Sequence, residues 1–180
     1  MARFTQINPE TATGKAKELL TAVKNKLGLV PNMMRAMATS PAVLEGYLSL
    51  NGALAGGSLT SKQREQIALT VGQANECDYC LAAHSTIGKM VGLTQDQITD
   101  SRRGTAVDAK TDKLLQFARK VVEQQGKVSE SEIANLHAAG FDDGAIGEVV
   151  ANVAVNIFTN YFNHVAETDI DFTKVEPLVG

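Results

Sequence analysis

The fold and the chemistry of this chain are decided by residues 60–92, which read TSKQREQIALTVGQANECDYCLAAHSTIGKMVG. This stretch contains the only two cysteines of the 180-residue chain, Cys77 and Cys80, which form a CxxC pair. His84 follows Cys80 by four residues, and Glu65 precedes Cys77 by twelve. Two thiols, an imidazole and a carboxylate are therefore brought together in one short segment.

The spacing of the cysteines and the histidine predicts a reactive thiol on a helix. Residues three or four apart share one face of a helix, so a helix that begins near Cys77 places Cys77, Cys80 and His84 in one stripe. The thiolate is the nucleophile, and the pKa of a cysteine falls from about 8.5 toward ~3.5–7.5 beside a histidine or at a helix N-terminus. Cys80 is therefore the better candidate for attack, and Cys77 is the better candidate for closing a disulfide.

Glu65 belongs to a preceding helix, whose first residues contain a capping box made by Thr60 and Gln63. On a helical wheel Glu65 falls inside the apolar arc of this helix, and a carboxylate in such a place must be paired or protonated. One interpretation is that Glu65 hydrogen-bonds to His84, orients its ring and ends a proton relay. The other interpretation is an ion pair between Glu65 and Arg64 at a helix–helix junction.

The pattern Glu-x11-Cys-x2-Cys-x3-His, preceded by Leu-Thr-x3-Arg-Glu, resembles the alkylhydroperoxidase D-like branch of the carboxymuconolactone decarboxylase superfamily. In that family the active-site set consists of the residues that match Glu65, Cys77, Cys80 and His84. The resemblance covers residues 43–120. The C-terminal stretch NYFNHVAETDIDF, residues 160–172, resembles the peroxidase-related proteins of the superfamily, and this tail resemblance covers residues 145–172.

The resemblance implies an antioxidant enzyme. The residue that matches Cys80 reduces a hydroperoxide and becomes a sulfenic acid, and the residue that matches Cys77 resolves it to a disulfide. The resemblance also implies an external dithiol or a lipoyl-bearing protein as reductant, and a homo-oligomer, often a trimer or hexamer. The lipoamide-dependent peroxidases commonly carry a histidine where this chain has Tyr79. Tyr79 is expected either to hydrogen-bond a bound peroxide oxygen or to be an aromatic plug beside the site.

Two other functions use the same residues. Cys77, Cys80 and His84, with Glu65 as a fourth ligand, are of the types that bind Zn²⁺, although structural zinc sites more often combine two ligand pairs. A disulfide reductase or redox sensor without significant peroxidase activity also fits a CxxC pair. No flavin, haem or nucleotide motif is visible in the sequence, so we expect no cofactor and a supply of electrons from another protein or a small thiol.

The charge and hydropathy of the sequence indicate which partners and which cellular compartment to expect. The net charge is −3, and no basic cluster exceeds a pair such as Arg102 and Arg103, so nucleic-acid binding has little support. No apolar run reaches the about 20 residues that span a bilayer. The N-terminal sequence MARFTQINPETATGKAKELL lacks the basic start and apolar stretch of a secretory signal, so we expect a cytoplasmic protein. In a reducing compartment a CxxC pair indicates redox or metal chemistry, not a structural disulfide.

Helical patterns on both sides of the cysteines predict a single all-α domain over residues 1–180, a helical bundle of about eight to nine helices with short loops. Hydrophobic residues make up 44% of the chain, which is enough for a sizeable core. A thioredoxin fold would instead require strands around the motif. The expected helices cover residues 10–27, 31–37, 42–54, 61–74, 77–92, 94–103, 108–125, 129–139 and 142–167.

The last helix, residues 142–167, is apolar on more than one face, which indicates burial on several sides or contact with another subunit. Three polar side chains interrupt its apolar pattern, Asn160, Asn163 and His164. Since buried polar groups are nearly always paired, we expect these residues to satisfy neighbouring hydrogen-bonding groups. The alternative is that His164 or Asn160 lines the pocket. The tail after Thr168 is expected to be irregular.

Overall fold

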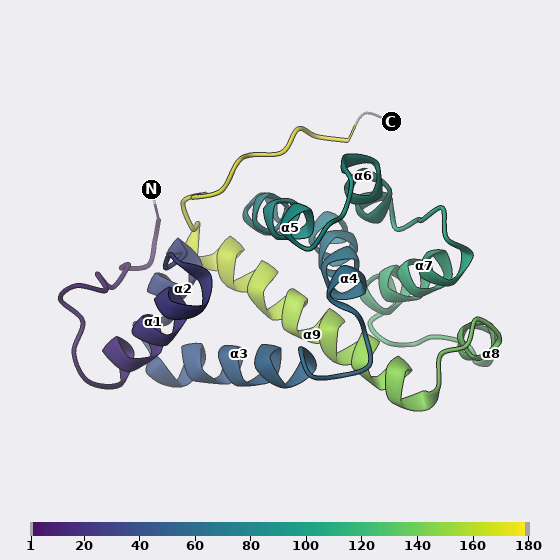
Figure 1. Ribbon diagram of the computed structural model, residues 1–180, viewed down its shortest axis with the longest axis horizontal. Coiled ribbons are helices and arrows are strands. Elements are labelled where there is room, and N and C mark those ends of the chain that lie inside the picture. The colour runs from purple at the N-terminus through teal and green to yellow at the C-terminus, as the bar shows by residue number, and fades with distance from the viewer. Residues whose placement is uncertain (1, 179–180) are drawn as a thin grey trace.

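A computed structural model describes residues 2–178 of the chain, and these residues form nine α-helices and no strand (Figure 1). The prediction of an all-α fold with eight to nine helices is confirmed. The helices are α1 (Gly14–Leu27), α2 (Asn32–Met37), α3 (Pro41–Leu54), α4 (Ser61–Ala74), α5 (Asp78–Met90), α6 (Gln95–Arg103), α7 (Ala109–Glu123), α8 (Glu130–Ala138) and α9 (Asp143–Ala166). In this part of the chain, no helix combines the length and the apolar character needed to cross a membrane.

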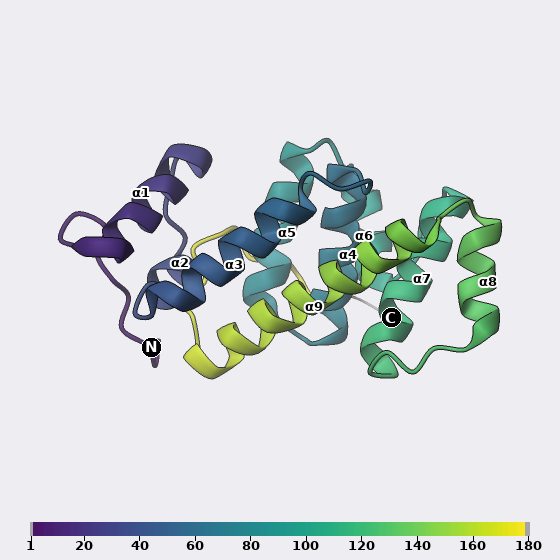
Figure 2. The same ribbon diagram turned by 90° about the horizontal axis from the view of Figure 1, so that it is seen from below.

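The long helix α9 runs diagonally through the molecule and links its two ends (Figure 1). Helices α1 and α2 lie near its C-terminal end, and α7 and α8 lie near its N-terminal end, while α3 runs alongside it (Figure 2). Helix α4 packs against α5, α6, α7 and α9, so it is the centre of the helical packing. The Glu65 helix α4 and the cysteine helix α5 are therefore neighbours, joined by a short hinge of residues 75–77.

The interior contains two large hydrophobic clusters. The first joins α4 and α7 to the beginning of α9, and its largest fully buried members are Ile67, Val71, Leu114, Leu115, Leu136, Val149 and Val153. The second joins α1, α2 and α3 to the start of α5, and it includes Leu20, Met33, Met34, Met37, Leu44, Cys77, Tyr79 and Cys80. Each fully buried side chain of this size contributes ~1.5–3 kcal/mol. The cysteine pair is therefore part of the hydrophobic core.

Side-chain caps begin most of the helices, as the sequence predicts. Complete capping boxes are formed by Thr60 with Gln63, Thr94 with Gln97, and Ser129 with Glu132. Asp142 begins α9 by accepting a hydrogen bond from the backbone N–H of Ala145 at 2.8 Å. A cap of this kind stabilises a helix by about 1 kcal/mol.

The first helix begins at Gly14, so the predicted start at Glu10 is wrong. The side chain of Asn8 accepts a hydrogen bond from the Glu10 backbone N–H at 3.0 Å, and the Asn8 carbonyl accepts from Ala12 at 2.9 Å. These bonds close a turn. Gly14 then has a φ of +55°, which costs a glycine little. Residues 10–13 therefore belong to a turn that precedes α1, not to the helix itself.

The residues that follow α9 are irregular, as predicted, but they are held against the other helices. Residues 168–178, named here the C-terminal segment, cross over α5 toward α6 (Figure 1). Asp171 accepts a hydrogen bond from the Asn32 backbone N–H at 2.7 Å. Arg102 donates to the Glu176 carbonyl at 3.0 Å. The segment thereby covers the outer side of α5.

Candidate active site

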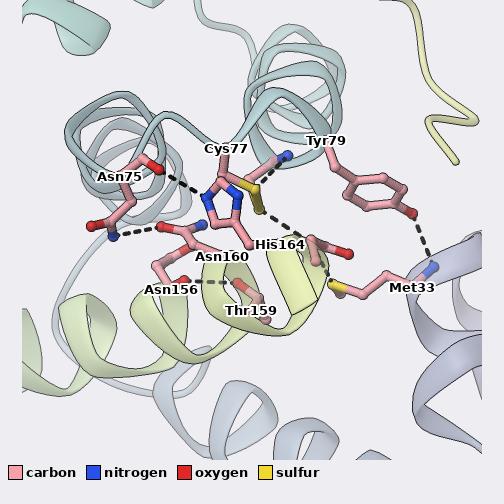
Figure 3. Close-up of a disulfide and its surroundings, with 10 residues drawn as sticks. Met33, Asn75, Cys77, Tyr79, Asn156, Thr159, Asn160 and His164 are labelled. Carbon is pink, nitrogen blue, oxygen red and sulfur yellow. Dashed lines mark hydrogen bonds between the residues drawn. A yellow bond between two sulfur atoms is a disulfide. The ribbon is translucent and has the colours of Figure 1, made fainter. Parts of the chain in front are cut away.

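The two cysteines lie at the N-terminus of α5, where Cys77 is the N-cap residue. Their sulfurs form a disulfide, with the Cα atoms 5.3 Å apart (Figure 3). The Cys80 backbone N–H donates to Cys77 Sγ at 3.4 Å. Glu76 directs the chain from α4 into α5 through a left-handed conformation with a φ of +53°. This turn places both sulfurs at the positive end of α5, which favours negative charge on sulfur.

His84 lies one turn further along α5 and is fixed by a residue of the neighbouring helix. Its Nδ1 lies 2.8 Å from Glu65 Oε2, and the side chains are 21% and 18% exposed. The interpretation that Glu65 hydrogen-bonds to His84 is confirmed. The rival interpretation, an ion pair with Arg64, is wrong for the described residues, because Arg64 donates to the Leu59 carbonyl at 2.6 Å and to Ser61 Oγ at 3.3 Å.

In the described part of the chain, the His84 ring makes no hydrogen bond to either sulfur of the disulfide. The ring instead lines a cavity of about 40 Å³ between α3, α4, α5 and α9. Room for one water requires ~10–15 Å³ and polar partners, so this cavity is large enough for at least one water. Its lining is Tyr47, Asn51, Arg64, Glu65, Ala68, His84, Asn152, Val155, Asn156 and Thr159.

Tyr47 contributes a neutral hydroxyl to this cavity. Burial, together with the nearby charge of Glu65, raises the pKa of Tyr47 to about 12. A phenol with this pKa keeps its proton at physiological pH, so Tyr47 is available as a hydrogen-bond donor. The imidazole of His84, the carboxylate of Glu65 and the phenol of Tyr47 therefore all line one small cavity.

Asn160 and His164, the polar residues singled out on the last helix, hold the hinge between α4 and α5 (Figure 3). Asn75 Nδ2 donates to Asn160 Oδ1 at 2.8 Å, and His164 Nε2 lies 2.9 Å from the Asn75 carbonyl. Neither residue lines the cavity beside His84. The expectation that they satisfy neighbouring groups is met by these contacts but not by Asn160 Nδ2, which is buried without a hydrogen-bond partner among the described residues. The alternative that His164 or Asn160 lines this pocket is not supported.

Asn163 reaches the cysteine pair directly. Its Nδ2 lies 3.3 Å from Cys80 Sγ and 3.2 Å from Met33 Sδ, and its side-chain oxygen is buried without a hydrogen-bond partner among the described residues. The sequence marks Asn163 as a polar residue on an apolar helix. No spacing rule connects position 163 with position 80, so its contact with the sulfur was missed.

Tyr79, between the two cysteines, points toward α2 (Figure 3). The Met33 backbone N–H donates to Tyr79 Oη at 3.2 Å. The ring packs edge-on against Phe172 of the C-terminal segment, with the centroids 5.8 Å apart. Burial raises the pKa of Tyr79 above its ordinary value, so the phenol stays neutral. These contacts match the aromatic plug, and they leave no free hydroxyl directed at a peroxide.

The four expected site residues are not arranged as metal ligands. Among residues 2–178, no group of three or more His, Cys, Asp or Glu side chains has an arrangement that holds a metal ion. The two cysteines are bonded to each other, and His84 is bonded to Glu65. The alternative of a zinc module with these four ligands therefore has no geometric support.

Comparison with known proteins places this site in a family context. The sequence profile of the carboxymuconolactone decarboxylase family matches residues 41–124, a span that contains Glu65, both cysteines and His84. No curated protein sequence matches the chain.

Solved structures share the fold. An uncharacterized peroxidase-related protein from Ralstonia eutropha JMP134, with an alkylhydroperoxidase AhpD core, superposes with a TM-score of 0.84 at 24% identity, over 94% of this chain and 92% of that chain. A peroxidase-related protein from Silicibacter sp. TM1040 gives 0.79 at 24% identity, over 86% and 84%. The debrominase Bmp8 in complex with 2,3,4-tribromopyrrole gives 0.79 at 17% identity, over 93% and 90%.

Proposed function

We propose that this chain, whose residues 41–124 match the carboxymuconolactone decarboxylase family and whose fold is that of the peroxidase-related proteins, is a thiol-dependent peroxidase of that superfamily. It reduces hydroperoxides through a dithiol/disulfide cycle of Cys77 and Cys80. The observation that carries the proposal is an oxidisable cysteine pair at the start of α5, one turn before a histidine that a partly buried carboxylate orients. The catalytic residues of the proposal are Glu65, Cys77, Cys80 and His84.

In the first half of the cycle, His84 accepts the proton of the Cys80 thiol, relayed by a water because no direct hydrogen bond joins the ring to the sulfur within residues 2–178, and Glu65 stabilises the imidazolium. The thiolate attacks the terminal oxygen of the hydroperoxide, so that an S–O bond forms and the O–O bond breaks. The leaving alkoxide takes the proton from His84 and departs as an alcohol. Cys80 is then a sulfenic acid.

In the second half, the Cys77 sulfur attacks the sulfenic sulfur, so that an S–S bond forms and the S–O bond breaks. The hydroxide leaves as water with the proton of Cys77. One hydroperoxide and two thiols thus give one alcohol, one water and one disulfide. An external dithiol then reduces the disulfide by thiol–disulfide exchange. Since Cys77 and Cys80 are each only 2% exposed, a slender dithiol such as a lipoyl arm fits this step better than a bulky protein thiol.

The test is mass spectrometry of the reduced protein after one equivalent of an organic hydroperoxide. We expect the unchanged protein to form the Cys77–Cys80 disulfide. The Cys77→Ser variant should stop at a Cys80 sulfenic acid that a dimedone probe captures, and the Cys80→Ser variant should lose turnover. If Cys80→Ser still consumes hydroperoxide in the presence of dithiols, the mechanism is wrong.

A disulfide reductase is the competing function of the same cysteine pair. The burial of both sulfurs favours a small hydroperoxide over a disulfide in another protein, because a protein disulfide cannot reach them without movement of the surrounding helices. The rates of hydroperoxide consumption and of reduction of a model protein disulfide, measured side by side, separate the two functions. A brominated pyrrole, the kind of compound bound by the debrominase of similar fold, belongs in the same assay.

A further inference from the structure

We propose that Asn163 is a fifth catalytic group, whose side-chain amide donates a hydrogen bond to the ionised sulfur of Cys80 and thereby makes Cys80, not Cys77, the attacking cysteine. This inference rests on the proposed peroxidase cycle. It goes beyond that cycle because Asn163 comes from α9, far from the CxxC motif in the sequence. The contact that carries the inference is the 3.3 Å distance between Asn163 Nδ2 and Cys80 Sγ.

The orientation of the Asn163 amide follows from the atoms around it. Its nitrogen contacts two sulfurs, those of Cys80 and of Met33, the second at 3.2 Å. A thioether and a disulfide have no proton to donate, so only the NH₂ end of the amide can bond to them. With the side chain only 5% exposed, the donor is already in place before the Cys80 sulfur becomes charged. A fixed donor of this kind needs no reorganisation when the charge develops.

The two sulfurs have different donors, and this difference decides which cysteine is more acidic. Cys77 is the N-cap residue of α5, and its sulfur accepts from the Cys80 backbone N–H at 3.4 Å. The helix N-terminus therefore favours a thiolate at Cys77. The Asn163 amide acts on Cys80, where it joins the effect of His84. Without the Asn163 donor, Cys77 becomes the more acidic of the two thiols.

The oxygen of the Asn163 amide supplies an independent observation. Oδ1 is buried and has no hydrogen-bond partner among the described residues, and an unpaired buried acceptor is destabilising. An O–H group that arrives during the reaction would satisfy it. Both the hydroperoxide and the sulfenic acid of Cys80 carry such a hydroxyl, so the same amide serves the thiolate with its nitrogen and the oxygen product with its carbonyl.

Other titratable groups face this region from each neighbouring element, and none is changed by a substitution at position 163. They are Tyr47 of α3, Glu65 of α4, Tyr79 and His84 of α5, His164 of α9 and Asp171 of the C-terminal segment. A change in the acidity of Cys80 that follows replacement of Asn163 can therefore be attributed to the lost donor.

The experiment measures iodoacetamide labelling of the reduced protein as a function of pH, with peptide mass spectrometry to identify the labelled cysteine. Asn163→Leu preserves the approximate volume and removes the donor. We expect it to raise the pKa of the Cys80 thiol by about one to two units, the range of a hydrogen bond to a charged group, and to make Cys77 the first cysteine labelled. Gln116→Leu, the control, removes an exposed amide on α7 and should leave Cys80 first.

Circular dichroism establishes that each variant is folded. Should Asn163→Leu not fold, Asn163→Asp keeps the side-chain shape, and its carboxylate should raise the pKa of Cys80 still further. A folded Asn163→Leu or Asn163→Asp protein with an unchanged pKa and unchanged labelling order overturns the inference. Labelling does not depend on peroxide, so an unchanged protein that labels first at Cys80 but consumes no hydroperoxide refutes the peroxidase proposal alone.

Discussion

At the scale of single residues, the bond between His84 and Glu65 determines how the imidazole can act. The ionised carboxylate only accepts hydrogen bonds, so His84 Nδ1 carries the proton of the 2.8 Å contact with Glu65 Oε2. The other ring nitrogen, Nε2, then has a free lone pair and can accept a proton. The hydrogen bond thus sets both the tautomer and the direction of the ring.

Replacing His84 by glutamine tests this role. The His84→Gln variant lacks the base, so we expect kcat/KM for hydroperoxide to fall by roughly 10²–10⁴, the range for loss of a general base. Glu65→Gln, which still accepts a bond from Nδ1, should lose less. The measurement is hydroperoxide consumption at saturating dithiol. Glu123→Gln, on the far side of α7, is the control, and an undiminished rate in His84→Gln would exclude the relay.

Tyr79 is expected to matter for stability and not for the reaction. Tyr79→Phe keeps the ring against Phe172 but removes the acceptor of the Met33 N–H, so we expect a loss of about 1 kcal/mol in the free energy of unfolding. Urea denaturation measures this loss. Hydroperoxide turnover should remain within about twofold, since a plug does not touch the substrate. A large loss of turnover in folded protein would place the hydroxyl in the reaction.

The residues of the candidate site were predictable to different degrees. The contact between Glu65 and His84 could be predicted from the sequence. A carboxylate inside the apolar arc of a helix requires a partner, and His84 lies on the next helix within reach. The contact of Asn163 with Cys80 could not be predicted from the sequence. It depends on how α9 lies against α5, which is a property of the packed helices and not of any local pattern.

At the scale of elements, the loop before α4 is held by a residue of α9. Glu148 accepts hydrogen bonds from the backbone N–H groups of Ser58 at 2.8 Å and Leu59 at 3.1 Å. These bonds hold the pKa of Glu148 below its ordinary value of 4.5. Because the loop leads into the capping box of α4, Glu148 helps to position the helix that carries Glu65.

Glu148→Gln should therefore destabilise the protein in a pH-dependent way. A carboxyl whose pKa is lowered by folding stabilises the protein fully above its ordinary pKa of 4.5, and this contribution is lost as the pH falls through the lower value of the folded state. We expect a loss of about 1 kcal/mol at pH 7. Urea unfolding at pH 7 and at pH 3 measures it, and an equal loss at both values would contradict the assignment.

The helix boundaries show what local signals can and cannot provide. The starts of α4, α6 and α8 are marked in the sequence by capping boxes, because a cap is made by residues three apart in the sequence. The start of α1 was misplaced because a turn closed by Asn8 precedes it. The path of the C-terminal segment was not predictable, since its anchors Asn32 and Arg102 lie far from it in the sequence.

At the scale of the whole molecule, we propose that copies of the chain associate through the exposed side of α9. Four large apolar residues recur there at helical spacing, Val150, Phe158, Tyr161 and Val165, which are 45%, 40%, 57% and 57% exposed. Residues at this spacing form one continuous stripe. A second copy of the chain is the occupant that fits, because the stripe is apolar along the length of the helix and self-association buries it.

Light scattering tests this proposal. We expect the unchanged protein to be larger than a monomer and Tyr161→Glu to shift it toward the monomer, since a buried unpaired charge disfavours association. Val107→Glu, at an exposed apolar residue on the loop after α6, is the matched control. A monomer at micromolar concentration would contradict the proposal.

Helix α9 contributes Ile146, Val149 and Val153 to one hydrophobic cluster, while Phe162 packs against the other. Because α9 is part of both clusters, thermal unfolding of either cluster disrupts the packing of the other. We therefore expect the two clusters to unfold cooperatively. Scanning calorimetry should then record a single endotherm whose calorimetric and van't Hoff enthalpies agree. The cysteines, which belong to the second cluster, would then stay covered by α2 and the C-terminal segment until the whole bundle unfolds.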